Sequence, residues 1–258
     1  MLYGVEKRLY ELLKELSDEY QLVGVKCEFE AEGSTFDDVV RVRDMCSKAG
    51  IEVHLKIGGA EAKRDVMDAV VLGVDGIIAP MVESPFAAYK FMKLVETIYP
   101  ESVHKPSIAI NIESKTAVAH MDGILEKLEG FLSQVTFGRT DLSGSYFDKN
   151  IVPDSDFVVG LVQEKAGMVK KKGMKVAMGG SISVRTVAKL KETKGFLDVV
   201  DKIETRKCIL PAKSMLKEGA LAKCLEFEKI YLVSLKERND VFNKGNLERL
   251  LKLEQRVF

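Results

Sequence analysis

The sequence predicts an α/β protein folded as a (β/α)₈ barrel, with an eighth strand that is atypical or missing and a helical extension at the C-terminus. The chain has 258 residues, which is the usual size of one such barrel. Short apolar segments alternate with helix-like segments, as in the repeated βαβ units of a parallel sheet. Glycines stand just before several apolar segments, where glycine commonly ends a helix: Gly50, Gly73, Gly130, Gly173 and Gly195.

The predicted elements follow this alternation along the chain. We expect strands at residues 22–30, 51–57, 74–82, 107–113, 131–137, 175–178 and 196–203. We expect helices at residues 36–49, 60–72, 85–98, 116–128, 156–172 and 184–193. A closed barrel needs one more strand, and we expect it near residues 204–210 or among the first residues. An open doubly wound sheet is the alternative that the pattern also allows.

The segment from Pro211 onward reads as helical to the end, with one break near residues 243–246. This tail is longer than one closing helix needs, so we expect it to pack on a second subunit of a homo-oligomer. No linker rich in Pro, Gly or Ser interrupts the chain. We therefore expect one barrel domain over residues 1–258, with the helical tail beginning at about residue 211.

Charge and cysteine usage narrow the classes of function. The chain has 39 Lys plus Arg and 39 Asp plus Glu, and this balance gives no reason to expect a nucleic-acid or membrane partner. The four cysteines form no Cys-x-x-Cys pair and no zinc-like spacing with histidine. The sequence shows neither a signal peptide at its start nor an apolar run of membrane-spanning length. A cytoplasmic protein is the expectation.

Two carboxylates follow consecutive predicted strands. Glu113 ends the strand at 107–113 on the face opposite its isoleucines, and Asp141 lies on a loop just after the strand at 131–137. In a barrel both would lie at the C-terminal mouth, where active sites form. Two carboxylates there, completed by water and substrate oxygens, suit Mg²⁺ or Mn²⁺. A salt bridge across the barrel is the alternative for Glu113.

Lys56 ends the strand at 51–57 and alternates with its apolar residues, so it is expected to point into the mouth. It could bind a substrate carboxylate or form a Schiff base as a nucleophile. An ion pair with Glu28 or Glu30 of the preceding strand is equally compatible with the sequence. His54 lies one layer deeper, where a histidine with satisfied hydrogen bonds is expected.

Three segments together resemble the HpcH/HpaI aldolase/citrate lyase family. Residues 73–84 read GVDGIIAPMVES, residues 110–118 read INIESKTAV with MDGIL at 121–125, and residues 137–143 read FGRTDLS. They occur in the order and spacing of that family over roughly residues 50–148. The resemblance implies a barrel of the phosphoenolpyruvate/pyruvate-binding superfamily.

The resemblance also implies a reaction. Glu113 and Asp141 would be the ligands of a divalent cation, Mg²⁺ or Mn²⁺. Gly138, Thr140 and Asp141 would lie beside a bound pyruvate or oxaloacetate unit. The metal would act as a Lewis acid on the enolate. The implied protein is a metal-dependent carbon–carbon lyase or aldolase, of aldehyde-lyase or oxo-acid-lyase type, that acts on a 2-oxo acid.

The sequence departs from that family at the substrate positions. Lys56 stands where the aldolases usually have an arginine, and it lacks the guanidinium fork. No histidine occurs in the loop after the first strand, which leaves Glu28, Glu30 and Glu32 as candidate bases, with Glu30 taken as the catalytic one. Arg139 replaces a small residue or proline and is expected to supply the missing guanidinium to the substrate.

Two other readings stay open at this point. Lys56 as a Schiff-base nucleophile would give a metal-independent aldolase. The altered base and arginine positions would also fit a non-catalytic scaffold that binds a metabolite. Neither the aldehyde or acyl co-substrate nor the choice of metal is specified by the sequence.

Overall fold

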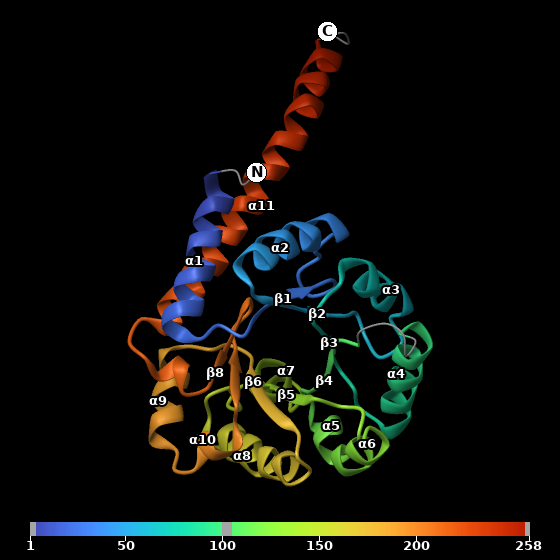
Figure 1. Cartoon of the computed structure of the whole chain (residues 1–258), viewed down its shortest axis with the longest axis vertical. Coiled ribbons are helices and arrows are strands. Elements are labelled where there is room, and N and C mark those ends of the chain that lie inside the picture. Colours follow the sequence, from blue (N-terminus) through green and yellow to red (C-terminus); the bar gives the residue numbers. More distant parts are fainter. Residues whose placement is uncertain (1–3, 100–104, 256–258) are drawn as a thin grey trace.

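The computed structural model describes residues 4–99 and 105–255, and within them eight strands close into a barrel (Figure 1). The strands lie around the ring in chain order. This confirms the predicted fold class. The strands are β1 (Gly24–Glu28), β2 (Glu52–Lys56), β3 (Gly76–Ala79), β4 (Ser107–Ile112), β5 (Gln134–Gly138), β6 (Lys175–Gly179), β7 (Lys202–Glu204) and β8 (Cys208–Pro211).

The eighth strand is atypical, as predicted, and it lies at one of the two expected places. β8 follows β7 after a short turn at residues 205–207 and runs antiparallel to both β7 and β1. The described neighbours from β1 through β7 all pair in parallel. The other candidate place, the start of the chain, is helix α1 (Gly4–Tyr20) instead.

The predicted strand at 196–203 begins too early. Residues Phe196–Val199 form the short helix α10 after Gly195, which has a left-handed φ of 76°. Phe196 is buried there and its carbonyl accepts a hydrogen bond from the Val200 amide. The apolar residues of this segment therefore pack through a helical turn, and the extended chain begins only at Lys202.

Helices surround the barrel, and short polar residues fix where several of them begin. Thr35, Ser84, Ser114, Ser155 and Ser183 each accept a hydrogen bond from a first-turn amide of the following helix. The remaining helices are α2 (Phe36–Ala49), α3 (Lys63–Leu72), α4 (Pro85–Ile98), α5 (Lys115–Ala119), α6 (Met121–Lys127), α7 (Arg139–Gly144), α8 (Asp156–Lys171), α9 (Val184–Glu192) and α11 (Ala220–Glu254), with a 3₁₀ turn at Ser214–Leu216.

Strand alternation separates an apolar outer face from a polar interior. Ile108, Ile110 and Ile112 of β4 are at most 5% exposed and belong to the hydrophobic core, as predicted. Burial of each such side chain contributes about 1.5–3 kcal/mol. The residues between them face the other way, and in several strands these are charged or polar: Lys26, Glu28, Lys56, Asn111, Thr136 and Glu204. The barrel interior is therefore built to hold charge near its mouth.

Helix α11 departs from the prediction at two points. Pro211 ends β8 rather than opening the tail, and the helix starts only at Ala220. It then runs without the expected break near residues 243–246. One interior glycine, Gly245, disfavours a helix by about 1 kcal/mol, which the flanking helical residues offset.

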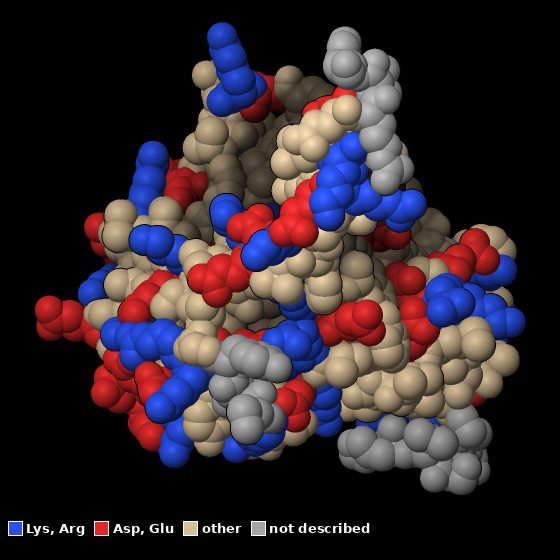
Figure 2. Space-filling view, turned by 90° about the horizontal axis from the view of Figure 1, so that it is seen from above, with Lys and Arg blue, Asp and Glu red and all other residues tan. Residues whose placement is uncertain are grey.

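The two halves of α11 have different surroundings. Its first half packs beside α1, and its second half projects away from the barrel (Figure 1). Arg238 pairs with Asp38 of α2, and the described residues beyond it are exposed. No helix in the described ranges has both the length and the apolar composition needed to cross a bilayer. Acidic and basic side chains are intermixed over the face seen in Figure 2, in keeping with the balanced charge.

Candidate metal and substrate site

A cavity of about 410 Å³ lies at the C-terminal ends of the parallel strands. The structure brings six of the residues singled out in the sequence to this cavity, namely Glu28, Lys56, Glu113, Gly138, Thr140 and Asp141. Leu225 and Glu228 of α11 form part of its wall.

Glu113 and Asp141 enter the cavity from neighbouring βα units. Glu113 directly follows β4 and is 3% exposed. Its Oε1 accepts a hydrogen bond from the Met81 amide (3.0 Å), and its Oε2 accepts one from Asn111 Nδ2 (3.0 Å). Asp141 lies in the first turn of α7, which begins immediately after β5, so the predicted loop is a short helix.

The electrostatic surroundings of Glu113 would favour a bound cation. Burial raises the pKa of Glu113 above its usual range. Attraction to Lys56 and the hydrogen bonds from Met81 and Asn111 oppose that shift, while repulsion by Asp141 adds to it. A cation bound between the two carboxylates would remove this repulsion.

Asn111 supplies an independent sign of the same kind. Its Oδ1 is buried and has no hydrogen-bond partner in the described residues. A buried, unpaired amide oxygen is unfavourable by about 1–3 kcal/mol unless a ligand or water occupies it. The oxygen belongs to the amide whose nitrogen bonds Glu113, so it lies in the same part of the cavity.

The donor set fits a hard divalent cation. The described lining has three cationic side chains, those of Lys26, Lys56 and Arg206, against five carboxylates, so a divalent charge would neutralise it. The described residues contain no cluster of three or more His, Cys, Asp and Glu side chains placed to hold a metal. The protein would thus supply two carboxylates and leave other positions to water and substrate, as Mg²⁺ sites commonly do.

Another part of the cavity lining is an ion-pair network around Glu28. Its Oε1 lies 3.3 Å from Lys26 Nζ, and its Oε2 lies 3.7 Å from Lys56 Nζ and 3.0 Å from Arg206 Nη1. Burial alone would raise the pKa of Glu28, but the three cations outweigh burial and hold it below its usual range. Lys56 therefore pairs with Glu28 and also attracts Glu113, and it lines the same cavity as Asp141.

Glu30 is not placed as predicted. It is exposed and does not line the cavity, and its side chain packs against the backbone at Gly58. β1 ends at Glu28, so the alternation that puts Lys26 and Glu28 inside does not extend to residue 30. Glu32 also points elsewhere, because it pairs with Lys207 at 2.5 Å. Of the three candidate bases, only Glu28 reaches the cavity.

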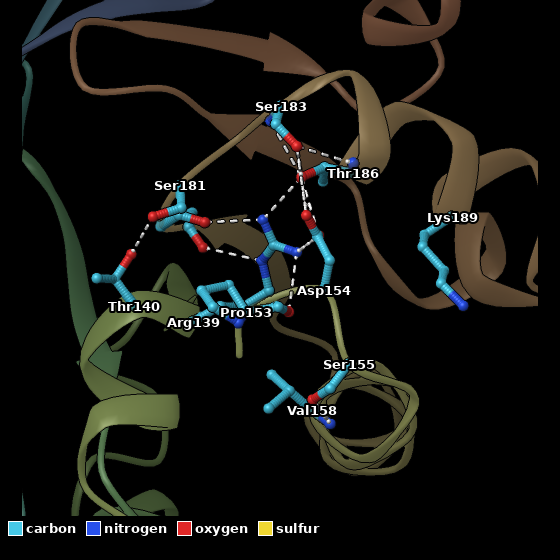
Figure 3. Close-up of polar contacts among 12 residues, drawn as sticks. Arg139, Thr140, Pro153, Asp154, Ser155, Val158, Ser181, Ser183, Thr186 and Lys189 are labelled. Carbon is cyan, nitrogen blue, oxygen red and sulfur yellow. Dashed lines mark hydrogen bonds and ion pairs between the residues drawn. The ribbon is translucent and has the colours of Figure 1, made fainter. Parts of the chain in front are cut away.

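Arg139 is likewise not placed as predicted. It is 1% exposed, and its guanidinium lies outside the cavity lining, bonded to Asp154 and to the carbonyls of Gly179 and Gly180 (Figure 3). These partners are distant from Arg139 in the sequence, so they could not be recognised from it. The position of Arg139 at the end of a predicted strand therefore led to the prediction that it contacts substrate. Arg206, conversely, lines the cavity and was not predicted, because the turn that carries it joins β7 and β8 without a helix.

Comparison with known proteins relates part of the chain to one family. The model of the HpcH/HpaI aldolase/citrate lyase family matches residues 35–149, which include β2 to β5. A family member from Burkholderia cenocepacia J2315 has a similar structure, with a TM-score of 0.61 and 13% identity over 86% of this chain and 90% of that chain. The HpcH/HpaI aldolase from Desulfitobacterium hafniense DCB-2 gives 0.57 and 17% over 74% and 80%, respectively.

A variant of the citrate synthase SbnG has the same fold, with a TM-score of 0.58 and 18% identity over 90% of this chain and 91% of that chain. At such identities the likeness concerns the fold. No significant match occurs among curated proteins. The family assignment therefore rests on the matched segment, which contains both Glu113 and Asp141. Residues 35–149 of this chain, about 45% of its length, match the model of the HpcH/HpaI aldolase/citrate lyase family.

Proposed function

We propose that the protein is a metal-dependent carbon–carbon lyase or aldolase that acts on a 2-oxo acid through a pyruvate-type enolate. The observation that carries this proposal is the meeting of Glu113, Asp141 and the unpaired Asn111 Oδ1 in one cavity at the barrel mouth. The family, which is of aldolase/citrate lyase type, supports the reaction class.

The lining residues divide into two groups under this proposal. Glu113 and Asp141 would hold Mg²⁺ or Mn²⁺, which supplies Lewis-acid stabilisation of the enolate. The backbone at Gly138 and Thr140 would border the 2-oxo acid. Lys56 would neutralise negative charge on the substrate, with Glu28 fixing its position. Glu30 and Arg139 have no direct contact with substrate in this arrangement.

An imine on Lys56 is the alternative mechanism. Lys56 does line the cavity, but its Nζ lies 3.7 Å from Glu28 Oε2, and an imine would replace this ion pair. Borohydride reduction in the presence of pyruvate separates the two mechanisms, because only an imine leaves a covalent adduct on Lys56.

The decisive experiment is hydrogen–deuterium exchange at the pyruvate methyl group in D₂O, followed by NMR. It needs no knowledge of the second substrate. We expect exchange with Mg²⁺ or Mn²⁺, none with EDTA, and none in Glu113→Gln or Asp141→Asn. Glu129→Gln, which alters an exposed carboxylate outside the cavity, is the matched control. Absence of exchange in the wild type with either metal would favour a metabolite-binding scaffold.

A further inference from the structure

We propose that Arg139 is a positioning residue for the candidate metal ligand Asp141. The inference rests on the proposed function, because it concerns how the site presents that ligand. Arg139 opens α7 and Asp141 is its third residue. Side chains two residues apart on a helix point to nearly opposite sides. Arg139 thus turns into the protein while Asp141 faces the cavity.

The guanidinium ties the start of α7 to the end of β6. Its Nε donates to the Gly179 carbonyl (3.2 Å), and its Nη2 donates to the Gly180 carbonyl (2.7 Å). Thr140 adds a second tie on the cavity side, where its Oγ1 lies 2.9 Å from Ser181 Oγ. Figure 3 shows the two ties on either side of the same turn.

Gly180 allows this close approach. A Cβ built on Gly180 would lie 2.5 Å from the Thr140 amide nitrogen and 2.7 Å from that of Arg139. The backbone at residue 180 is therefore packed directly against the first amides of α7. A six-residue helix with no side-chain cap at Gly138 gains its fixed position from these contacts.

Asp154 binds the guanidinium of Arg139. Its Oδ1 accepts from Arg139 Nη1 (2.5 Å) and from Thr186 Oγ1 (3.0 Å), and its Oδ2 accepts from Ser183 Oγ (3.3 Å). Ser183 and Thr186 form the capping box of α9. One buried carboxylate thereby joins the segment after α7 to the start of α9 (Figure 3).

The consequence is that the ion pair between Arg139 and Asp154, which lies outside the cavity lining, fixes the orientation of Asp141. Removal of the guanidinium takes a donor away from the carbonyls of Pro153, Gly179 and Gly180. It also leaves the buried Asp154 carboxylate with hydroxyl donors alone and no counter-charge, which favours movement of α7. Loss of partners that orient a metal ligand typically weakens metal affinity about 10–100-fold. Arg139 variants should therefore lose cation affinity rather than fold.

Mn²⁺ binding without substrate tests the proposal. The dissociation constant is measured by electron paramagnetic resonance for the wild type, Arg139→Met, Arg139→Lys and Asp154→Asn, with the unfolding midpoint of each metal-free protein. We expect at least a tenfold weaker affinity in Arg139→Met and Asp154→Asn, and a smaller loss in Arg139→Lys, which keeps the charge but not the fork. The control is Arg43→Met, which breaks an ion pair with Asp75 outside the cavity (2.5 Å). It should lower the midpoint and leave Mn²⁺ affinity unchanged.

Each outcome has one meaning. Mn²⁺ affinity within twofold of wild type in a folded Arg139→Met protein overturns the positioning role and leaves the proposed function intact. If Arg139→Met does not fold, Arg139→Lys and Asp154→Asn decide, and wild-type affinity in both overturns the role. Equal loss of affinity in Arg43→Met would show a general effect of stability and also overturn it. Wild-type protein without Glu113-dependent Mn²⁺ binding overturns both proposals.

Discussion

The carboxylate of Glu113 occupies the space that a side chain at residue 138 would need. A Cβ built on Gly138 would lie 2.4 Å from Glu113 Oε2 and 2.9 Å from Glu113 Cβ. Glycine at this position, where φ is −87°, is therefore explained by space and not by backbone conformation. Glu113, which directly follows β4, provides the carboxylate, and Gly138 at the end of the neighbouring β5 leaves space for it.

Gly138→Ala is expected to displace Glu113 from the cavity wall. The metal-free variant should fold with a lowered unfolding midpoint, because rotation relieves the clash with the carboxylate but the contact with Glu113 Cβ requires a backbone shift. Its Mn²⁺ affinity should fall by an amount similar to that in Glu113→Gln. Gly160→Ala in α8, where an added Cβ meets nothing within 4 Å, is the control. Unchanged Mn²⁺ affinity in Gly138→Ala would argue against Glu113 as a ligand.

Asn111→Leu should separate stability from ligand binding. The unpaired Oδ1 disappears, which favours the metal-free protein, but Glu113 loses its donor and the cavity loses an oxygen. We expect that Mg²⁺ raises the unfolding midpoint of the variant less than that of the wild type. Calorimetric scans with Mg²⁺ and with EDTA measure both. An equal rise in the two proteins would show that Asn111 has no part in cation binding.

Replacement of Lys56 tests whether its role is that of a charge. Lys56→Arg keeps a cation in the cavity that contains the candidate metal ligands, and Lys56→Met removes it. Loss of one stabilising group of this kind typically lowers the rate on the order of a hundredfold. We expect pyruvate exchange to fall by that order in Lys56→Met and to survive largely in Lys56→Arg. Inactivity of both, together with a borohydride adduct in the wild type, would establish the imine mechanism.

Acid sensitivity should arise in part from Asp201, which lies outside the cavity. Burial alone would raise its pKa, but hydrogen bonds from Lys170 and the Val176 amide, with attraction by Lys170 and Lys175, hold the pKa below its usual range. A lowered pKa in the folded state stabilises the fold above the unfolded-state pKa of about 3.9, and this stability is lost as the pH falls through the folded value.

Asp201→Asn should therefore flatten the dependence of the free energy of unfolding on pH below about pH 4. Chemical denaturation between pH 7 and pH 3 gives the comparison. Asp18→Asn, which alters an exposed carboxylate, serves as the control and should keep the wild-type slope. If both variants have that slope, Asp201 does not contribute.

Removal of the projecting part of α11 should change assembly and leave the barrel intact. We propose that this part contacts a second copy, because Phe242, Leu247 and Leu251 are each more than half exposed on it. A chain that ends after Arg238 should unfold at a temperature close to that of the wild type and sediment as a smaller particle. A full-length protein that sediments as a monomer would contradict the proposed homo-oligomer.

The sequence predicted the part of the fold that depends on local patterns. Isoleucine alternation in β4 fixed which face is buried, and this placed Glu113 inside correctly. The prediction failed where long-range contacts decide. Arg139 directly follows β5, as a substrate ligand would, but the Asp154 carboxylate and the carbonyls of Gly179 and Gly180 hold it inside the protein. Glu30 was assigned to the wrong side because nothing local marks the end of β1 at Glu28.

The barrel closes where the antiparallel β8 pairs with β1, and we call this β1–β8 pairing the seam. β1 and β8 are in register at only two positions, Gly24 with Ile209 and Val25 with Cys208, whereas β5 and β6 share five. The paired residues at the seam are about 185 positions apart in the chain, so their meeting carries the largest loss of chain entropy among the strand pairs. We therefore expect barrel closure to be the last step of assembly and the first to reverse. In the native protein, amide protons along this seam should exchange with solvent before those between β5 and β6.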